Sequence, residues 1–492
     1  MRDLEKAYKS LTDWMIKHPQ DVLSSRRQLQ EKLLKKRFLY GDSAMQTTLM
    51  PVFLKRKSLE KIRYTSAVLD RVIDKVIDLY FVDEYVREYF PSHYEVPREW
   101  LHADPGYKKS TLLNRLDVIF DGKTLKYIEF NTDNPGGKGW VDMLEHLYLS
   151  HPLYSDFIDF SDVGDRSIVK AQFNAVMKAM EAYSVAESKP RVALVSFSGM
   201  GSRGDEEIVR DYFIEQGIES NLIDPRDFEY RNSGLYSNGV KFNAVIRSMT
   251  ARFFLYHPRE LKDFLKAATN KNVCVINSFR AVLGSEKSIL SFLTNPLNHR
   301  YFTEEEVRVI KAHVPWSRKF DETVTLSKEG EEVSIKRYML QKREELVIKP
   351  SNGAGGYGVM VGKSTDPLAW AEAIEENIGS PGWIVQEYVE IPTVKLPVIK
   401  NNKVVMEQKY LNLSPYVFGG EYSGILGRVS DKSVINISAG GGLIPVFPLR
   451  EDGESRTPFG ERRRADATAD EPAAPMIEEA DEEPISGDGE DG

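Results

Sequence analysis

The chain has 492 residues, of which 41% are apolar, and a formal net charge of −8. This length predicts a globular protein of two to four domains. A membrane span is not expected, because no run of 18 apolar residues occurs. The single cysteine, Cys274, excludes an intrachain disulfide and a cysteine-rich metal site, and we expect it to pack in a buried strand. With no signal peptide recognised at the N-terminus, we expect a cytoplasmic location.

The acidity is concentrated at the C-terminal end of the sequence. Residues 451–492 contain 15 acidic and 4 basic residues, so this segment carries −11 and the rest of the chain carries +3. Its bias toward Ala, Pro, Glu and Asp predicts a disordered tail, because too little apolar surface is available to order it. A solubilising or regulatory tail is favoured, and contact with a protein partner is the alternative. The body shows no concentrated basic stripe, so nucleic acid is not an expected partner.

Helical periodicity dominates residues 1–110. The stretch from Ser58 to Phe90 predicts one long or broken helix. It contains no residue pattern with an evident chemical role, and we interpret the region as packing and support.

A β-hairpin is predicted between residues 113 and 131, where two alternating strands flank Asp-Gly-Lys. Successive side chains on a strand point to opposite faces. The apolar residues fall on even positions: Leu116, Val118, Phe120, Ile128 and Phe130. The polar residues fall on odd positions: Arg115, Asp117, Glu129 and Asn131. Only an odd-numbered loop keeps both faces pure, so we predict that Arg115 opposes Glu129 and Asp117 opposes Tyr127.

Strands and helices alternate from residue 191 to 283, which predicts a parallel, Rossmann-like sheet. In this region "SFSGMGSRGDEE" lies where a strand meets a helix N-terminus, a position suited to an anion or a carboxylate substrate. Its polar members are Ser198, Ser202 and Arg203. A turn without a ligand is the alternative, with about equal weight.

A glycine-rich segment, "VIKPSNGAGGYGVMVG", follows a predicted helix at residues 285–296. Glycines let the backbone approach a ligand, and successive amide groups can bind phosphate oxygens. Lys349 ends the apolar strand and is placed to meet nucleotide phosphates, although the spacing is that of neither a Walker loop nor a Rossmann fingerprint. A glycine-rich hairpin without a ligand is the alternative. The strand "WIVQEYVE" carries Gln386, Glu387 and Tyr388, which could adjoin an adenine, although a plain strand is favoured for this segment alone.

The polar face of the hairpin is suited to Mg²⁺, which prefers oxygen ligands from one or two carboxylates together with phosphates. Asp117, Glu129 and Asn131 supply such oxygens, and Arg115 can neutralise a γ-phosphate. A solvated face with one Arg–Glu pair is the alternative.

These motifs together resemble the ATP-grasp superfamily in its circularly permuted branch, typified by glutathionylspermidine synthetase. The resemblance covers about residues 110 to 448 and rests on an R-x-D…E-x-N pattern at Arg115, Asp117, Glu129 and Asn131, which precedes Lys349 as a permuted order requires. It implies Lys287 as a further ATP lysine and Arg428 as a mobile catalytic arginine beside Arg115. The implied nucleotide contacts are Lys287, Lys349, Ser351, Asn352, Gly353, Gly355, Gly356, Gln386, Glu387 and Tyr388.

The resemblance implies an α/β fold with a permuted ATP-grasp, a Rossmann-like domain that precedes the grasp, and a helical N-terminal region. The implied segments are a helical region at 1–110, a metal-ligand part at 111–190, a Rossmann-like substrate domain at 191–283, an ATP-binding part at 284–450 and an acidic tail at 451–492. The chain has no cysteine-containing amidase domain, and its substrate segments do not support glutathione or a polyamine as substrates.

The implied activity is ATP- and Mg²⁺-dependent ligation of a small-molecule or peptide carboxylate to an amine through an acyl phosphate, with release of ADP and phosphate. An ATP-grasp phosphotransferase is the alternative enzyme. A nucleotide-binding partner protein without catalytic activity is the alternative outside enzymes.

Overall fold

The computed structural model describes most of the chain up to residue 450. The described ranges are 2–35, 37–40, 43–154, 166–183, 190–199, 202–321, 323–353, 355–435 and 440–450. The segment 451–492, predicted as a disordered tail, lies outside the described residues. In the part that is described, no helix combines the length and the apolar character needed to cross a membrane.

The N-terminal region is mainly helical, as predicted, but it also contains short strands. Its helices are α1 (Arg2–Lys17), α2 (Pro19–Lys35), α3 (Arg56–Val82), α4 (Glu84–Glu88), α5 (Ser92–Glu95) and α6 (Arg98–His102). The strands are β1 (Leu39–Tyr40), β2 (Ser43–Ala44), β3 (Gln46–Thr47) and β4 (Val52–Leu54). The predicted long helix is broken at Asp83, whose carboxylate accepts hydrogen bonds from the first turn of α4. Because β3 and β4 pair in parallel with β23 (Gly442–Ile444) and β24 (Val446–Pro448), the two ends of the described chain are joined.

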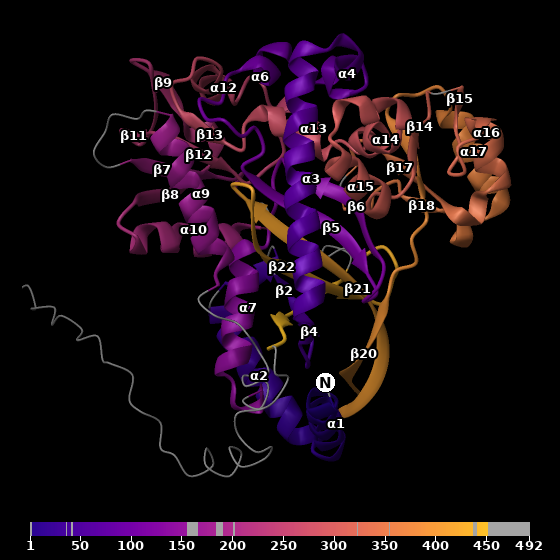
Figure 1. Cartoon of the computed structure of the whole chain (residues 1–492). Helices are drawn as coiled ribbons and strands as arrows, with labels where there is room; N and C mark the ends of the chain where they lie inside the picture. The colour runs from indigo at the N-terminus through magenta and orange to yellow at the C-terminus, as the bar shows by residue number, and fades with distance from the viewer. Residues whose placement is uncertain are drawn as a thin grey trace, which may run out of the picture.

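The largest sheet combines the early hairpin with strands from the C-terminal part of the chain (Figure 1). Its order is β3-β23-β22-β21-β5-β6, and β20 pairs with β21. The remaining strands of this sheet are β5 (Leu113–Phe120), β6 (Leu125–Asn131), β20 (Thr393–Lys400), β21 (Lys403–Phe418) and β22 (Glu421–Ser430). The junction between the two parts of the chain is an antiparallel pairing of β5 with β21, in which Val118 opposes Leu413 and Arg115 opposes Tyr416. Segments far apart in the sequence therefore share one sheet.

The hairpin register differs from the prediction. Phe120 pairs with Leu125, so the loop has four residues and the predicted odd-numbered loop is wrong. A β-bulge restores the polar face, because the register shifts after Asp117, which opposes Glu129 and not Tyr127. The bulge leaves Ile128 as the extra residue.

The predicted membership of the apolar face is confirmed except at one position. Leu116, Val118, Phe120 and Phe130 join the hydrophobic core, whereas Ile128 faces a cavity. The cause is the bulge, since one extra residue reverses the side-chain alternation on β6.

The predicted strand–helix alternation forms a four-stranded parallel sheet with the order β13-β12-β7-β8. Its strands are β7 (Arg191–Val195), β8 (Glu219–Ile223), β12 (Ala244–Arg247) and β13 (Cys274–Ile276). The helices of this region are α7 (Lys138–Ser150), α9 (Ile168–Ala182), α10 (Arg203–Glu215), α11 (Ala251–Leu255) and α12 (Lys262–Thr269). Three further strands form a small sheet: β9 (Glu229–Arg231), β10 (Gly234–Ser237) and β11 (Val240–Phe242). Cys274 is fully buried in β13, which confirms its packing role, and burial raises the pKa of its thiol to about 12.

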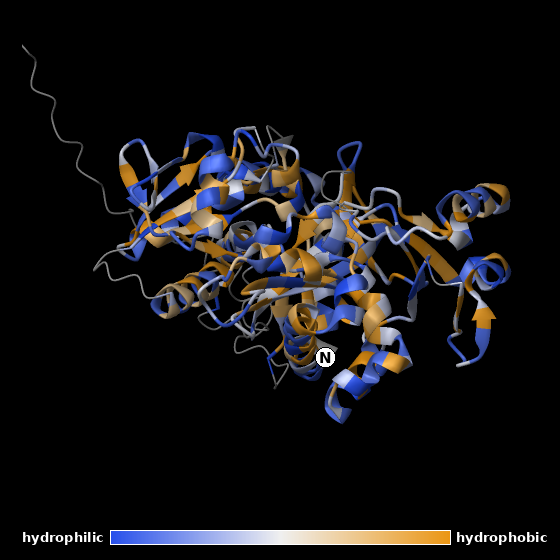
Figure 2. Cartoon of the chain, turned by 90° about the horizontal axis from the view of Figure 1, so that it is seen from above, coloured by the Kyte–Doolittle hydropathy of each residue, from blue (hydrophilic) through white to orange (hydrophobic). Residues whose placement is uncertain are grey.

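A smaller antiparallel sheet with the order β14-β19-β17-β18 carries the glycine-rich segment. Its strands are β14 (Ser317–Lys319), β17 (Leu346–Pro350), β18 (Met360–Val361) and β19 (Trp383–Glu387), and a separate hairpin pairs β15 (Val324–Leu326) with β16 (Glu332–Ser334). The helices of this part are α13 (Val282–Ser285), α14 (Ser288–Thr294), α15 (Glu304–His313), α16 (Ile335–Gln341) and α17 (Pro367–Asn377). This lobe has its own apolar core around Trp316, Phe320 and Trp370. The central strands carry long apolar runs in Figure 2, whereas peripheral helices alternate between polar and apolar residues.

Candidate active site

A cavity of about 270 Å³ lies between the large sheet and the smaller antiparallel sheet. Its walls come from β5 and β6, from β17 and the glycine-rich segment, from β19, and from β21 and β22. Most of the residues predicted from the sequence line it: Arg115, Asp117, Glu129, Asn131, Lys287, Lys349, Gly353, Gly355, Gly356, Gln386, Glu387, Tyr388 and Arg428. The structure therefore brings the hairpin near residue 120 and the glycine segment near residue 355 together.

The metal-ligand candidates lie side by side at the polar end of the hairpin. Asp117 lies directly opposite Glu129, and Arg115 lies opposite Asn131. Asp117 is 6% exposed, its Oδ2 lies 2.6 Å from Nη2 of Arg428, and its Oδ1 lies 3.3 Å from Nε of Arg115. Burial by itself raises the pKa of Asp117, but the charges of Arg428 and Arg115 lower it to about 2. Asp117 is therefore a carboxylate across the physiological pH range.

Glu129 is paired with a lysine from another part of the chain. Nζ of Lys287 lies 3.0 Å from Oε1 of Glu129 and also donates to the carbonyl of Gly353 at 2.6 Å. The backbone N–H of Lys287 donates to the carbonyl of Ser351. Lys287 occupies the N-cap position of α14 and does not lie within a longer helix as expected. It ties the carboxylate of the hairpin to the start of the glycine segment.

Lys349 is a second enclosed cation of the site. It is 7% exposed, and its Nζ donates to Oε1 of Gln386 at 2.6 Å and to the carbonyl of Ile128 at 3.4 Å. Burial lowers the pKa of Lys349, and although nearby Glu129 raises it, the balance places the pKa at about 8. The β-bulge thus contributes to the site, because the carbonyl of its extra residue, Ile128, accepts a hydrogen bond from Lys349.

Arg428 comes from β22 and points into the cavity. Besides Asp117, it donates to Oδ1 of Asn412 and to Oγ of Ser414, both on the neighbouring strand β21. Asn412 also lines the cavity and was missed by the sequence interpretation. In the sequence, Asn412 is marked only as a polar residue between two leucines. Its role becomes evident in the structure, where it lies opposite Arg428 in the pairing of β21 with β22.

Replacing Arg428 by Met is expected to lower the free energy of unfolding by about 2 kcal/mol, because Asp117 keeps Arg115 as a partner at 3.3 Å but loses its shorter contact with Arg428. Urea unfolding measures the effect. A matched control is Arg226→Met: Arg226 also holds an aspartate at 2.6 Å, but its side chain is 44% exposed. Because the guanidinium of Arg226 is exposed to solvent, we expect a smaller loss in this variant, so equal losses in the two variants would contradict the prediction.

The glycine segment needs glycine where it packs against the chain after β22. Gly356 has a φ of +78°, and a Cβ placed there would lie 2.5 Å from Cγ1 of Val434. Two predicted nucleotide contacts lie outside the cavity lining. Ser351 is buried, its Oγ accepts from the N–H of Ser288, and the amide of Asn352 donates to Glu95.

One end of the cavity is apolar. It is lined by Val347, Val361, Val389 and Ile391. Glu387 and Tyr388 lie at this end, and Glu387 forms an ion pair with Lys328. Polar and apolar ends in one cavity suit a ligand with a flat apolar part and a charged part.

The oxygen-rich end fits a divalent cation. Asp117 and Glu129 are carboxylates at facing positions, and the side-chain amide nitrogen of Asn131 is buried with no hydrogen-bond partner among the described residues. A 180° flip of that amide would place its oxygen, which can bind a cation, at this unpartnered position. Two carboxylates and an amide oxygen form a donor set of the kind that Mg²⁺ prefers.

The predicted substrate residues do not line this cavity. Ser198 is exposed after β7, and its N–H donates to Asp224, while Arg203 at the start of α10 pairs with Glu207. Ser202 is the N-cap residue of α10. Three residues on, Asp205 accepts hydrogen bonds from the N–H groups of Gly137 and Gly139, so the end of the parallel sheet is tied to the turn after β6.

Comparison with known proteins accounts for this arrangement. Residues 169–386 match the model of a family described as a circularly permuted ATP-grasp. The structure of a glutathione synthetase-like effector from Globodera pallida, in its apo form, superimposes with a TM-score of 0.58 at 12% identity, covering 87% of this chain and 97% of that one. The chain has a circularly permuted ATP-grasp fold.

Among curated sequences, an uncharacterised protein of Synechocystis sp. is 29% identical over 259 residues, which cover 48% of this chain and 50% of that protein. An uncharacterised protein of Mycobacterium tuberculosis is 26% identical over 255 residues, which cover 48% of this chain and 42% of that protein. The chain thus spans about half the length of these relatives. The ATP-grasp family match includes Lys287 and Lys349 but not the hairpin or Arg428, which the structure adds to the cavity.

Proposed function

We propose that the protein is an ATP-dependent carboxylate–amine ligase. The observation that carries this proposal is the cavity in which hairpin carboxylates, two lysines and two arginines meet. The described lining holds four cations (Arg115, Lys287, Lys349 and Arg428) and three carboxylates (Asp117, Glu129 and Glu387). Such a balance suits a polyphosphate that arrives with Mg²⁺, because the metal offsets the carboxylates and the side-chain cations offset the phosphates.

Each part of the nucleotide has a matching surface in this proposal. The apolar end holds the adenine, beside Gln386, Glu387 and Tyr388. The glycine segment and the two lysines hold the phosphates, with Ser351 and Asn352 supporting its start. Asp117, Glu129 and Asn131 would hold Mg²⁺, which would neutralise negative charge on the phosphates during transfer.

The reaction begins when a carboxylate oxygen of the substrate attacks the γ-phosphorus. The bond from the γ-phosphorus to the β-phosphate bridging oxygen breaks, so ADP leaves and an acyl phosphate remains. Arg115 and Arg428 stabilise the charge on the transferring group, and positioning with charge stabilisation supplies nearly all of the catalysis. An amine then attacks the acyl carbon, loses a proton to solvent, and phosphate leaves as the amide forms.

The substrates are proposed to bind at the carboxyl ends of the parallel sheet, within the predicted substrate domain at residues 191–283. Strand order reverses beside β7 there, and ligands of open α/β sheets bind at such a point. Ser198, Ser202 and Arg203 lie at this edge. The contact of Asp205 with Gly137, next to Gly136 whose carbonyl accepts from Arg115, connects the edge with the phosphate end of the cavity.

Product analysis tests the proposal. The protein is incubated with ATP, Mg²⁺ and pooled carboxylates and amines, and mass spectrometry follows the products. We expect a condensation product together with ADP and phosphate. A phosphorylated acceptor with ADP would show a phosphotransferase instead, and nucleotide binding without ADP formation would show a protein that only binds nucleotide.

A further inference from the structure

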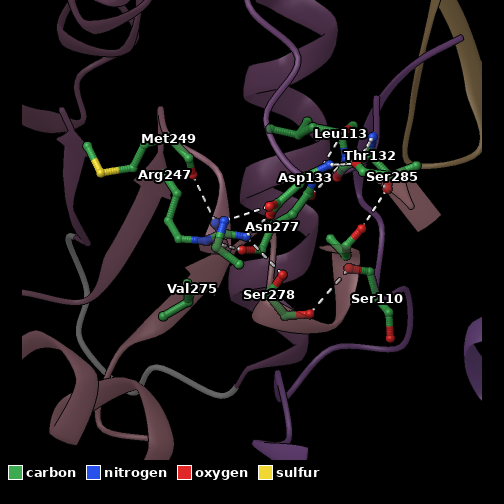
Figure 3. Close-up of polar contacts among 12 residues, drawn as sticks. Ser110, Leu113, Thr132, Asp133, Arg247, Met249, Val275, Asn277, Ser278 and Ser285 are labelled. Carbon is green, nitrogen blue, oxygen red and sulfur yellow. Dashed lines mark hydrogen bonds and ion pairs between the residues drawn. The ribbon is translucent and has the colours of Figure 1, made fainter. Parts of the chain in front are cut away.

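A buried polar junction lies where the parallel sheet meets the metal-ligand hairpin (Figure 3). At its centre is Arg247, the last residue of β12, whose side chain is 0% exposed. Its Nη2 lies 2.6 Å from Oδ1 of Asp133 and 3.0 Å from the carbonyl of Ser278. Its Nε donates to the carbonyl of Asn277, and its Nη1 donates to that of Met249.

Four hydrogen bonds use four of the five N–H donors of Arg247, and both carboxylate oxygens of Asp133 accept one. The second oxygen of Asp133 accepts the N–H of Ala251 at 2.6 Å, and the ring of Phe279 lies 5.0 Å from the guanidinium carbon. A buried ion pair is costly to form unless hydrogen bonds satisfy most of its remaining donors and acceptors, as they do here. Such a pair holds its two backbone segments at one separation.

Asn277 links the two strands of the hairpin at their open end. Its Nδ2 donates to the carbonyls of Leu113 and Thr132, and its Oδ1 accepts the N–H of Leu113. Leu113 begins β5, and Thr132 directly follows the last residue of β6. The side chain thus bridges the hairpin where hairpins otherwise fray.

Ser285 adds a third segment to the junction. Its Oγ accepts the N–H groups of Thr132 and Asp133, both at 2.9 Å, and it lies at the end of α13 just before Lys287. Asp133 lies two positions after Asn131, so a displacement of Asp133 moves the metal-ligand strand directly.

We propose that Arg247, with Asn277 and Ser285, is a positioning residue that holds Asn131 and Glu129 in the geometry required for the divalent cation. The inference rests on the proposed function, because it takes these side chains as cation ligands. Arg247 does not line the cavity; it reaches the hairpin through Asp133 and through Asn277, whose carbonyl accepts from its Nε. Groups that orient metal ligands cost about 10- to 100-fold in metal affinity or activity when they are removed.

Direct titration with Mn²⁺ tests the inference without relying on turnover. The free Mn²⁺ signal in electron paramagnetic resonance is followed for wild-type protein and for Arg247→Lys, each with a non-hydrolysable ATP analogue. Lysine keeps the charge but loses the forked geometry. We expect Mn²⁺ affinity to fall at least tenfold, whereas affinity for the metal-free analogue changes less than twofold, because β17 and β19 hold the nucleotide.

Two further variants distinguish a specific effect on metal binding from a general loss of folding. Ser285→Ala removes one hydroxyl and is expected to weaken Mn²⁺ binding at least threefold without unfolding the protein. Glu306→Gln breaks a 2.6 Å ion pair with Lys75, remote from the junction, and is expected to lower only the melting temperature. Unchanged Mn²⁺ affinity in Arg247→Lys and Ser285→Ala, or an equal loss in Glu306→Gln, would overturn the positioning role.

The titration also separates this inference from the ligase proposal. Wild-type protein that binds Mn²⁺ with the analogue, and loses that binding in Asp117→Asn, but forms no amide would refute the ligase activity alone. The comparison between variants would then still decide the positioning role. Wild-type protein that binds no Mn²⁺ with the analogue would overturn the inference itself.

Discussion

Replacing Asp117 by Asn is expected to lower kcat/KM about a thousandfold, or ~4 kcal/mol in the activation barrier. The variant keeps the shape of the side chain but removes the charge that pairs with Arg428 and would bind the cation. Steady-state assays of ADP release at several Mg²⁺ concentrations measure the loss. High Mg²⁺ should restore little activity. In the variant, an amide oxygen replaces one of the only two carboxylates among the proposed metal ligands Asp117, Glu129 and Asn131.

Asp121→Asn is the matched control, because Asp121 lies on the same hairpin but at its exposed turn. Its Oδ1 accepts the N–H groups of Lys123 and Thr124, and an asparagine oxygen can accept the same bonds. We expect this variant to retain wild-type turnover. If Asp117→Asn were as active as Asp121→Asn, the metal assignment at the hairpin would be wrong.

Replacing Lys349 by Met is expected to lower kcat/KM about a hundredfold, because a cation that faces developing charge in an enclosed site is worth several kcal/mol. Both the KM for ATP and kcat should change, since in the proposed mechanism the ammonium contacts the phosphates before and during transfer. Lys363→Met is the control: Lys363 is exposed and pairs with Glu390 beyond the cavity. A comparable loss in Lys363→Met would show that the effect of Lys349→Met is not local.

The pH dependence of nucleotide binding gives a second measurement on Lys349. Burial lowers its pKa to about 8, so the side chain loses its charge as the pH rises through that value. Nucleotide affinity should therefore fall above pH 8 in the wild type, whereas Lys349→Arg should keep it, because arginine stays charged.

The same shift has the opposite effect on stability. The unfolded lysine keeps its proton up to about pH 10.5, so between pH 8 and 10.5 the unfolded state binds more protons and the free energy of unfolding rises with pH. Urea titrations at several pH values should show this contribution in the wild type and lose it in Lys349→Met. A contribution that persists in Lys349→Met would assign the titration to another group.

The polar face of the hairpin shows which structural features the residue pattern alone predicts. Asp117, Glu129, Arg115 and Asn131 alternate with apolar neighbours, and this period of two is a local property that the backbone preserves on folding. Their common face was therefore predictable. Their pairing was not, because an even loop and a bulge at Ile128 together set the register, and both depend on how β5 pairs with β21.

The contacts between site residues show more clearly what the residue pattern does not predict. Arg428 meets Asp117, 311 positions away in sequence, only because β21, the partner of β22, also pairs with β5. The predicted odd loop and the predicted helix position of Lys287 failed for the same reason, since contacts between distant segments override local preference.

The sequence by itself determined which side chains could bind a nucleotide and a cation, because their chemical type, strand alternation and glycine spacing depend only on residues that are close together in the sequence. Only the tertiary structure decided which of them meet, in which register, and with what charge partners. Those outcomes depend on the closing of one sheet around segments from both ends of the described chain, a packing that no local pattern encodes.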